Sequence, residues 1–356
     1  MKNYFVVGCF LVAFLFANQY AVAEKKPKNV IFMIGDGMGL AQLYAGMVTN
    51  NNKLEIERCT TIGLSKTYSS NKFTTDSGAG GTALACGVKT KNGMIGMKPD
   101  TTVVESILEL CEKNKLSTGI VVACALTHAT PASYIAHQKN RDMYEEIAAD
   151  YLKTDIDVFI GGGRKHFEER LDKRNLTTEL KAKNYSIAYN LADVQAVKSG
   201  KLAGLLYDVH NPPMPERGNM LPESTMAAID ILDNNKKGFF LMIEGSQIDW
   251  ACHNNNLTQE IKEVLDFDQT IGKVLDFAQK DGNTLVVITA DHETGGLTIL
   301  DGKFGSDNMT SKFSTKDHSG VPVPIYAFGP GAENFSGFME NVAMKAKIEK
   351  LLNLKK

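Results

Sequence analysis

The chain has 356 residues, enough for one large α/β domain or two smaller ones. Hydrophobic residues make up 43% of it and charged residues 22%, a composition that excludes an intrinsically disordered chain. The formal net charge is −2, so no basic excess indicates a nucleic-acid partner.

The N-terminus has the pattern of a secretory signal peptide. Lys2 precedes an apolar run from Phe5 to Phe16, and Ala21-Val22-Ala23 forms an A-x-A cleavage site. The apolar run is too short for a transmembrane anchor. We therefore predict a signal peptide over residues 1–23 and a single exported domain over residues 24–356. This mature chain would be periplasmic or secreted, with no membrane span.

Five cysteines remain after cleavage, and an odd number leaves at least one without a disulfide partner in the chain. Cys111 and Cys124 lie in apolar helix and strand patterns, which favours core positions. The absence of C-x-x-C spacing argues against a structural zinc knuckle.

Short apolar runs alternate with helical patterns along the mature chain, which predicts an α/β fold with a largely parallel central sheet and helices on both faces. The predicted strands cover residues 28–34, 117–125, 157–160, 238–243, 284–289 and 321–328. The predicted helices cover residues 102–113, 141–151, 222–234, 259–280 and 339–352. Residues 173–222 are interpreted as a surface excursion with short helices, and residues 301–316 as a polar loop.

Polar side chains with metal-ligand chemistry follow four of these strands. Ligands of open α/β sheets bind outside the carboxyl ends of the strands, where such side chains would converge. They are Asp36, His128, Thr130, Glu244, Asp291 and His292.

A glycine-rich stretch from Thr74 to Leu84 surrounds Ser77 and runs into a helical pattern that begins at Thr82. A serine at a helix N-terminus faces unpaired backbone N–H groups, a geometry that suits phosphate. On this stretch alone, an N-cap serine in a glycine-rich turn is the simpler interpretation.

The histidines divide into two groups. Asp249 and His253 are spaced i and i+4, so on a helix they share one face and could bind one cation; the alternative is an N-cap Asp and a surface His. His318 is a further candidate ligand. Mixed nitrogen and oxygen ligands suit zinc, whereas oxygen-rich sites suit magnesium. We expect His137 to be a packed structural residue, and His166 and His210 to lie at the surface.

Six segments in the same order resemble the alkaline phosphatase family, and together they span nearly the whole mature chain. They are Asn29–Gly39 (NVIFMIGDGMG), Thr75–Leu84 (TDSGAGGTAL), His128–Arg141 (HATPASYIAHQKNR), Glu244–His253 (EGSQIDWACH), Thr289–His292 (TADH) and His318.

The resemblance implies hydrolysis of phosphate monoesters with two zinc ions and one magnesium ion, releasing inorganic phosphate. Ser77 matches the nucleophile that becomes phosphorylated, and Arg141 matches the arginine that clamps two phosphate oxygens. The family's metal ligands match Asp36, Asp291 and His292 at the first zinc, Asp249, His253 and His318 at the second, and Thr130 and Glu244 at the magnesium, with Asp36 bridging toward it.

The sequence departs from some members of the family at two positions. His128 stands where some bacterial members have an aspartate near the third metal, although animal members also have a histidine there. Trp250 stands where those bacterial members have a lysine near the substrate; the alternative is a packed aromatic residue. We expect magnesium as the third metal. The chain lacks the large crown insertion of animal members, and the family's usual homodimer is expected.

Two other functions remain open at this point. A phosphodiesterase or nucleotidase of the same superfamily would share the metal ligands, but it usually has a threonine nucleophile. A non-catalytic exported metal- or phosphate-binding protein would require a broken ligand set or nucleophile, and each expected position is filled. Ser77-Gly78-Ala79 lacks the Pro and Arg that a sulfatase would need.

Overall fold

The computed structural model describes residues 26–355. The predicted signal peptide, residues 1–23, lies outside this range. In the described part of the chain, no helix is long and apolar enough to cross a membrane.

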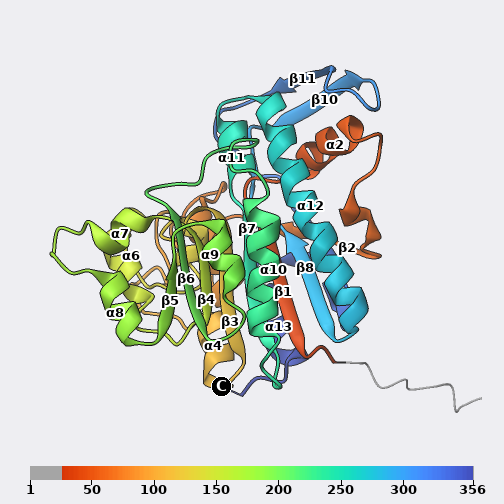
Figure 1. The fold of residues 1–356 in the computed structure, drawn as a ribbon. Coiled ribbons are helices and arrows are strands. Elements are labelled where there is room, and N and C mark those ends of the chain that lie inside the picture. The colour runs from red at the N-terminus through yellow and green to blue at the C-terminus, as the bar shows by residue number, and fades with distance from the viewer. Residues whose placement is uncertain (1–25, 356) are drawn as a thin grey trace, which may run out of the picture.

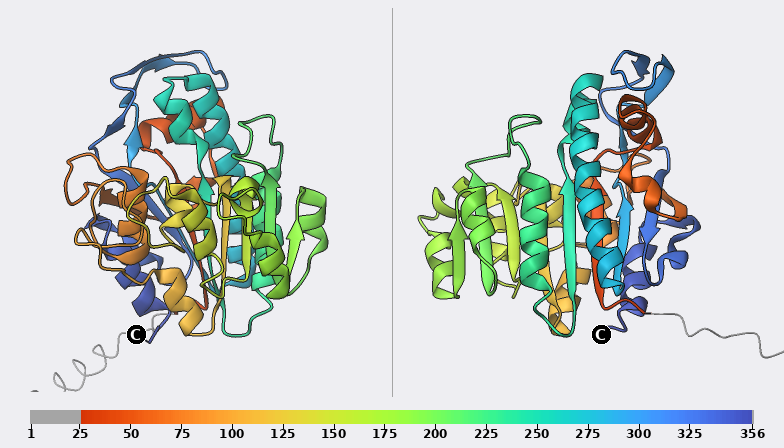
Figure 2. Two further views of the ribbon diagram at one scale, coloured as in Figure 1. Left: turned by 90° about the vertical axis from the view of Figure 1, so that its left-hand side faces the viewer. Right: turned by 45° about the vertical axis from the view of Figure 1, so that its right-hand side comes forward.

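Ten of the described strands form one central sheet, and helices lie on both of its faces (Figures 1 and 2). Neighbouring strands are parallel except at β13, which is antiparallel to both of its neighbours. This arrangement confirms the predicted largely parallel sheet. The order across it is β14 (Gly337–Glu340), β2 (Thr61–Lys66), β13 (Val323–Phe328), β8 (Thr284–Thr289), β1 (Asn29–Gly35), β7 (Phe239–Gly245), β3 (Ser117–Ala125), β4 (Val158–Gly162), β6 (Lys201–Tyr207) and β5 (Tyr185–Ala188).

The central strand β1 shows why these apolar runs become strands. All of its residues are buried, because both faces of the sheet are covered. Alternate side chains of a strand point to opposite faces. Phe32 therefore enters a core formed with α3 (Ser77–Cys86), α4 (Ile107–Lys113) and α13 (Ala343–Leu351). Met33 enters the opposite core, which α10 (Met220–Leu232) and α12 (Leu257–Asp281) cover.

Predictions about two polar segments need correction. The short helices predicted in residues 173–222 are confirmed as α8 (Leu176–Ala182) and α9 (Leu191–Ala196), but the segment also contains the sheet strands β5 and β6 and is not only a surface excursion. Residues 301–316 include β11 (Met309–Phe313), which forms a hairpin with β10 (Leu297–Gly302). Both hairpin strands have exposed faces, and β5 is a four-residue edge strand, so none of them needs a continuous apolar run.

Several predicted helices have different starts. The pattern over residues 102–113 becomes α4 only from Ile107, where Ser106 provides the N-cap. The pattern over residues 141–151 becomes α6 (Tyr144–Asp150). The pattern over residues 339–352 starts within β14 and becomes helical in α13.

All five described cysteines are free and buried, which confirms Cys111 and Cys124 as core residues. His137 is confirmed as a structural residue, because its ring bridges the Gly96 carbonyl and the Glu109 carboxylate at 2.8 and 2.9 Å.

One buried carboxylate in α12 has no role in the sheet or its covering helices. Glu260 is 0% exposed, and neither of its carboxylate oxygens has a hydrogen-bond partner. Burial raises the pKa of Glu260 well above its ordinary value. The unfolded carboxyl ionises near pH 4.3, roughly, whereas the folded one retains its proton to higher pH. Burial of Glu260 therefore lowers the free energy of unfolding by an amount that grows as the pH rises above the pKa of the unfolded carboxyl.

We expect Glu260→Met to raise the free energy of unfolding at pH 8 by about 1–3 kcal/mol, because it removes a buried polar group without a partner. The gain should shrink toward pH 4.5, where both states of the wild-type carboxyl are increasingly protonated. Urea unfolding of the metal-loaded protein at several pH values measures this difference. Glu260→Gln, which keeps a buried polar group, is the control. A loss of stability in Glu260→Met at pH 8 would contradict the assignment.

Candidate functional site

The predicted ligands meet at one edge of the sheet because they follow adjacent parallel strands. Asp36 follows β1, Asp291 follows β8, and Glu244 lies near the end of β7. Thr130 lies in α5 (Ala129–Ala132), directly after β3. Three groups of side chains at this edge have ligand atoms within 4.8 Å of one another.

Ser77 is the first residue of α3 and is buried beside this edge. The helix begins five residues before the predicted start at Thr82, and Asp76 rather than Ser77 is its N-cap, accepting a hydrogen bond from the Ala79 N–H at 2.9 Å. Glycines are tolerated in α3 because the helix packs closely on its neighbours. A Cβ at Gly81 would lie 2.8 Å from the Ser133 hydroxyl.

The first group is Asp36, Asp249 and His292, and Asp291 and Ser77 also contact the imidazole of His292. Its Nε2 lies 3.3 Å from Ser77 Oγ, 3.5 Å from Asp36 Oδ1 and 3.1 Å from Asp291 Oδ2. Burial raises the pKa of Asp36 well above its ordinary value, and the nearby carboxylates of Asp291 and Asp249 raise it further. One nitrogen, two carboxylates and a hydroxyl therefore converge on a small buried volume.

The second group is Asp249, His253 and His318. Asp249 and His253 are both in α11 (Gln247–His253), and the carboxylate Oδ2 lies 3.3 Å from His253 Nε2. The predicted shared helix face is therefore confirmed. His318 Nε2 lies 3.2 Å from His253 Nε2 and 3.6 Å from Asp249 Oδ1.

The tautomers of the two histidines follow from their outer partners. His253 Nδ1 contacts the Lys316 carbonyl at 2.5 Å, and His318 Nδ1 contacts the Thr75 carbonyl at 2.7 Å. A carbonyl only accepts hydrogen bonds, so each Nδ1 must carry the proton. In the neutral rings the two Nε2 lone pairs then face one another. This arrangement is the one that a bound cation stabilises.

Thr294 connects the first two groups, although no sequence motif indicated it. Its hydroxyl donates to Asp249 Oδ1 and lies 3.2 Å from His292 Nδ1. The rings of His292 and His318 are stacked, with centroids 3.6 Å apart. The two groups therefore form one continuous centre.

The third group contains Cys124, His128 and Glu244. Ser246 Oγ donates to Glu244 at 2.7 Å, and the Cys124 thiol donates to the same oxygen at 3.4 Å. Burial raises the pKa of Glu244 to about 7. Thr130 Oγ1 lies 3.5 Å from Asp36 Oδ2, so Asp36 lies between the first and third groups. Cys124 had been assigned only to the core, because its strand pattern carries no sign of this neighbourhood.

Arg141 lies beside the start of α3. Its Nη1 donates to Asp76 Oδ2 at 3.1 Å, and its Nη2 lies 3.4 Å from His128 Nε2. Burial lowers the pKa of His128 to about 3, and the charge of Arg141 contributes, so the ring is neutral and accepts from the guanidinium. Asp76 thus caps the serine helix and also holds the arginine, and its position directly before Ser77 is the only sequence signal for this role.

Buried polar atoms without hydrogen-bond partners test whether this centre fits metal ions. Such atoms are rare in folded proteins and require an explanation. Carboxylate oxygens and imidazole nitrogens are also the donors that zinc and magnesium bind. The unpartnered atoms here are Asp36 Oδ1, Asp291 Oδ2, Glu244 Oε1 and His128 Nδ1, so the residues fit divalent cations.

Trp250 and His128 form a wall beside Arg141, and their ring centroids are 5.7 Å apart. His210 completes this wall, with its centroid 4.7 Å from that of Trp250. The prediction that His210 and His166 are surface residues is wrong. Both are half-buried, and His166 Nδ1 contacts Thr127 Oγ1 at 2.6 Å.

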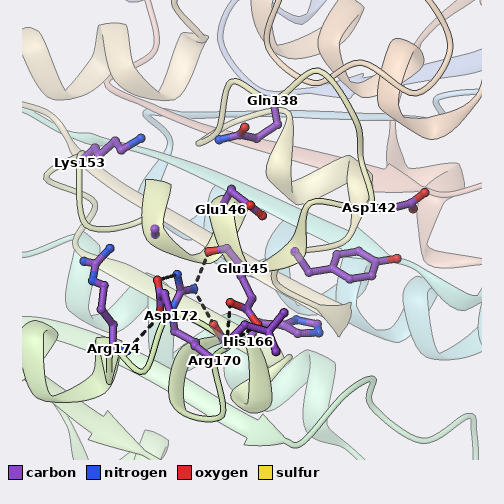
Figure 3. A pocket seen from close by; sticks show the side chains of 12 residues that line it. Gln138, Asp142, Glu145, Glu146, Lys153, His166, Arg170, Asp172 and Arg174 are labelled. Atoms are coloured by element: carbon purple, nitrogen blue, oxygen red, sulfur yellow. Dashed lines mark hydrogen bonds and ion pairs between the residues drawn. The ribbon is translucent and has the colours of Figure 1, made fainter.

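A pocket of about 720 Å³ lies outside this centre, between α6 and α7 (Arg164–Glu168) with the segment that follows α7 (Figure 3). His166 lines it, and several of its charged side chains already have partners. Arg170, for example, donates to both oxygens of Asp172. None of the predicted site residues lines this pocket.

Comparisons with known proteins agree with this geometry. A family model described as Alkaline phosphatase matches residues 27–312. Alkaline phosphatase 4 of Bacillus subtilis (strain 168) is 35% identical, and the match covers 97% of this chain and 94% of that protein.

Solved structures give the same result. The alkaline phosphatase of the Antarctic bacterium TAB5 superposes with a TM-score of 0.89 at 43% identity, covering 93% of this chain and all of that one. The cold-active enzyme of the psychrophile Shewanella sp. has a TM-score of 0.84 at 30% identity, covering 91% and 99%. A mutant of the TAB5 enzyme holds magnesium in its M3 site.

The family model covers most of the chain, a relative is more than 30% identical over nearly its full length, and the fold is that of the solved enzymes. The chain belongs to the alkaline phosphatase family, whose members are metal-dependent enzymes that hydrolyse phosphate monoesters.

Proposed function

We propose that this chain hydrolyses phosphate monoesters through a phosphoserine intermediate at Ser77, with two zinc ions and one magnesium ion bound. The position of Ser77 Oγ carries the proposal: it is at the N-terminus of α3 and 3.3 Å from His292 Nε2, at the edge of the three groups. Family membership supports the reaction class.

The three groups suggest how the cations would be held. The first zinc would take the group around His292, and the second would take the group around His253. Magnesium would be held by the oxygens of Glu244 and Thr130, with His128 beside them and Asp36 bridging. The full proposed set is Asp36, Ser77, Asp291 and His292; Asp249, His253 and His318; and Thr130, Glu244 and His128. Bound cations would lower the pKa of the serine hydroxyl and of a water molecule, and neutralise charge on the entering and leaving oxygens.

Ser77 would attack phosphorus, forming an Oγ–P bond as the bond to the leaving alcohol breaks. Water would then attack the phosphoserine, release inorganic phosphate and regenerate the hydroxyl. The free N–H groups at the start of α3 favour the negative charge of the phosphoryl group. Because phosphoryl transfer depends mainly on positioning and charge neutralisation, this fixed donor set suits the chemistry.

Arg141 would bind two phosphate oxygens through its planar guanidinium. Asp76 limits its rotation through the 3.1 Å ion pair, so part of the ordering cost is met before substrate binds. Trp250 would contact the substrate from the adjacent wall.

We also propose that the mature protein is a single exported domain over residues 24–356, periplasmic or secreted, and a homodimer. The signal-peptide pattern supports export. The continuity of the sheet through the described chain supports one domain.

Ser77→Ala should reduce kcat by about a thousandfold or more, because the group that accepts the phosphoryl is lost. Bound zinc and magnesium, measured by elemental analysis, should change little. Ser133→Ala, which removes another buried serine next to α3, is the control and should retain activity. Near-wild-type turnover by Ser77→Ala would overturn the nucleophile assignment.

Chelation should abolish turnover of p-nitrophenyl phosphate at alkaline pH, and zinc plus magnesium should restore it. The melting temperature should also fall on chelation, because cations that bind only the folded state stabilise it. The same assay with bis-p-nitrophenyl phosphate separates the related functions. Faster diester turnover would indicate a phosphodiesterase, and no turnover of either ester with metal bound would indicate a binding protein.

Arg141→Lys should raise the KM for p-nitrophenyl phosphate and weaken inhibition by inorganic phosphate, each by about tenfold, because one ammonium replaces a two-pronged donor. Steady-state kinetics measure both constants. The control is Arg164→Lys, a change at an exposed ion pair with Asp208. An unchanged inhibition constant for phosphate would contradict the proposed role.

A further inference from the structure

We propose that His210 is a positioning residue of the substrate site, which holds the ring of Trp250 in place beside His128. This inference rests on the proposed function only in that Trp250 and Arg141 border the bound substrate. His210 belongs to none of the motifs that carry the family resemblance, and it lies after β6, a strand that the sequence pattern did not predict.

The ring of His210 is fixed by a backbone donor. The Ala125 N–H, at the end of β3, donates to His210 Nδ1 at 3.1 Å. Nδ1 therefore accepts, and in the neutral ring the proton is on Nε2. Nε2 has no hydrogen-bond partner among the described residues, so the ring is oriented by this one bond and by its contacts with other rings.

The rings of His210, His128 and Trp250 pack edge to face, each against the other two. The His210 ring lies 4.7 Å from the Trp250 ring at 78° and 5.8 Å from the His128 ring at 84°. The His128 and Trp250 rings meet at 84° as well. Edge-to-face pairs are favoured by the ring quadrupoles. Rotation of any one ring would therefore disturb the other two.

The wall is coupled to the proposed phosphate clamp. His128 contacts both the His210 ring and Arg141, because its Nε2 lies 3.4 Å from Arg141 Nη2. A displacement of His210 would be transmitted to Trp250 directly and to Arg141 through His128.

The backbone next to His210 is tied to the helix that carries Trp250. Gln247, three residues before Trp250 in α11, donates from Nε2 to the Asn211 carbonyl at 2.9 Å and to the Ala123 carbonyl at 2.8 Å. One buried amide thus joins the loop after β6, the end of β3 and α11. The relative positions of His210 and Trp250 are set by this bond.

The remainder of the loop is anchored to α12 by buried charges. Arg217 forms ion pairs with Glu263 and, at 2.6 Å, with Asp266, and all three side chains are no more than 1% exposed. The Met214 N–H donates to Glu263 at 2.9 Å. The segment after His210 is therefore bonded to the rest of the protein at Asn211 and again at Met214 and Arg217. These bonds hold the backbone that carries the His210 ring.

Trp250 provides a direct test, because it is the only tryptophan in the chain. In the metal-loaded protein, His210→Ala should increase acrylamide quenching of Trp250 fluorescence by about twofold, and raise the KM for p-nitrophenyl phosphate by about three- to tenfold, since an edge-to-face contact is lost. The value of kcat should change less than about twofold, because the wall contributes to binding rather than to the chemical step.

His210→Phe, which keeps a ring but not the acceptor, should restore both the quenching and the KM toward wild-type values. The matched control is His166→Ala, which removes a half-buried histidine at the same edge of the sheet that contacts neither Trp250 nor His128. It should change neither quantity. Circular dichroism and melting temperature report on folding for each variant.

Wild-type quenching and KM in a folded His210→Ala protein would overturn the proposal. Losses in His210→Phe equal to those in His210→Ala would also overturn it, because contact between a ring at this position and Trp250 would then not hold the indole in place. If the wild-type protein does not hydrolyse the ester, the proposed function fails, but the quenching measurements still decide whether His210 positions Trp250.

Discussion

Buried negative charge at one edge of the sheet is the constraint on which the site depends. Burial raises the pKa of Asp36, and the carboxylates of Asp291 and Asp249 raise it further; Asp249 also acts to raise the pKa of Asp291. The imidazoles offset part of this repulsion, since His292 lowers the pKa of Asp291 against the effect of burial. Buried carboxylate oxygens without hydrogen-bond partners are costly, so bound cations would stabilise the fold as well as supply the proposed chemistry.

The parallel ladder determines where these charges lie. In the register of the sheet, Ile34 pairs with Glu244 on β7 and with Thr289 on β8. The residues that follow Ile34 and Thr289 therefore lie at the same edge of the sheet as Glu244. Strands about 4.8 Å apart then place successive side chains within reach of one ion. The loops supply the rest, such as the carbonyls of Lys316 and Thr75, which orient the two histidines of the second group.

The contrast between residues placed by the sheet and groups supplied by loops explains what the sequence could predict. The ends of long buried strands are local features that predict Asp36 and Asp291, and the i, i+4 spacing of Asp249 and His253 is an equally local feature of a helix. The start of α3 at Ser77 was missed, because glycines are poor helix formers and only close packing on Ser133 and Asp291 explains them. The strand β6 was missed because its surroundings are polar and broken by prolines. The position of His210 against Trp250 depends on both the strand and its loop, so no local pattern indicated it.

Local sequence patterns and contacts between distant segments also specify different parts of the site. A proposed ligand such as Asp36 is placed by the backbone of a central strand, which is fixed on both sides by neighbouring strands. The aromatic wall is placed instead by side-chain bonds between distant segments, of which the Gln247 amide and the Arg217 ion pairs are the clearest. Removing one partner from such a buried network leaves the others unsatisfied, so the wall tolerates change less readily than its position in loops would suggest. The geometry beside the proposed phosphate position is therefore held by the same scaffold as the proposed metal ligands, although it depends far less on local sequence.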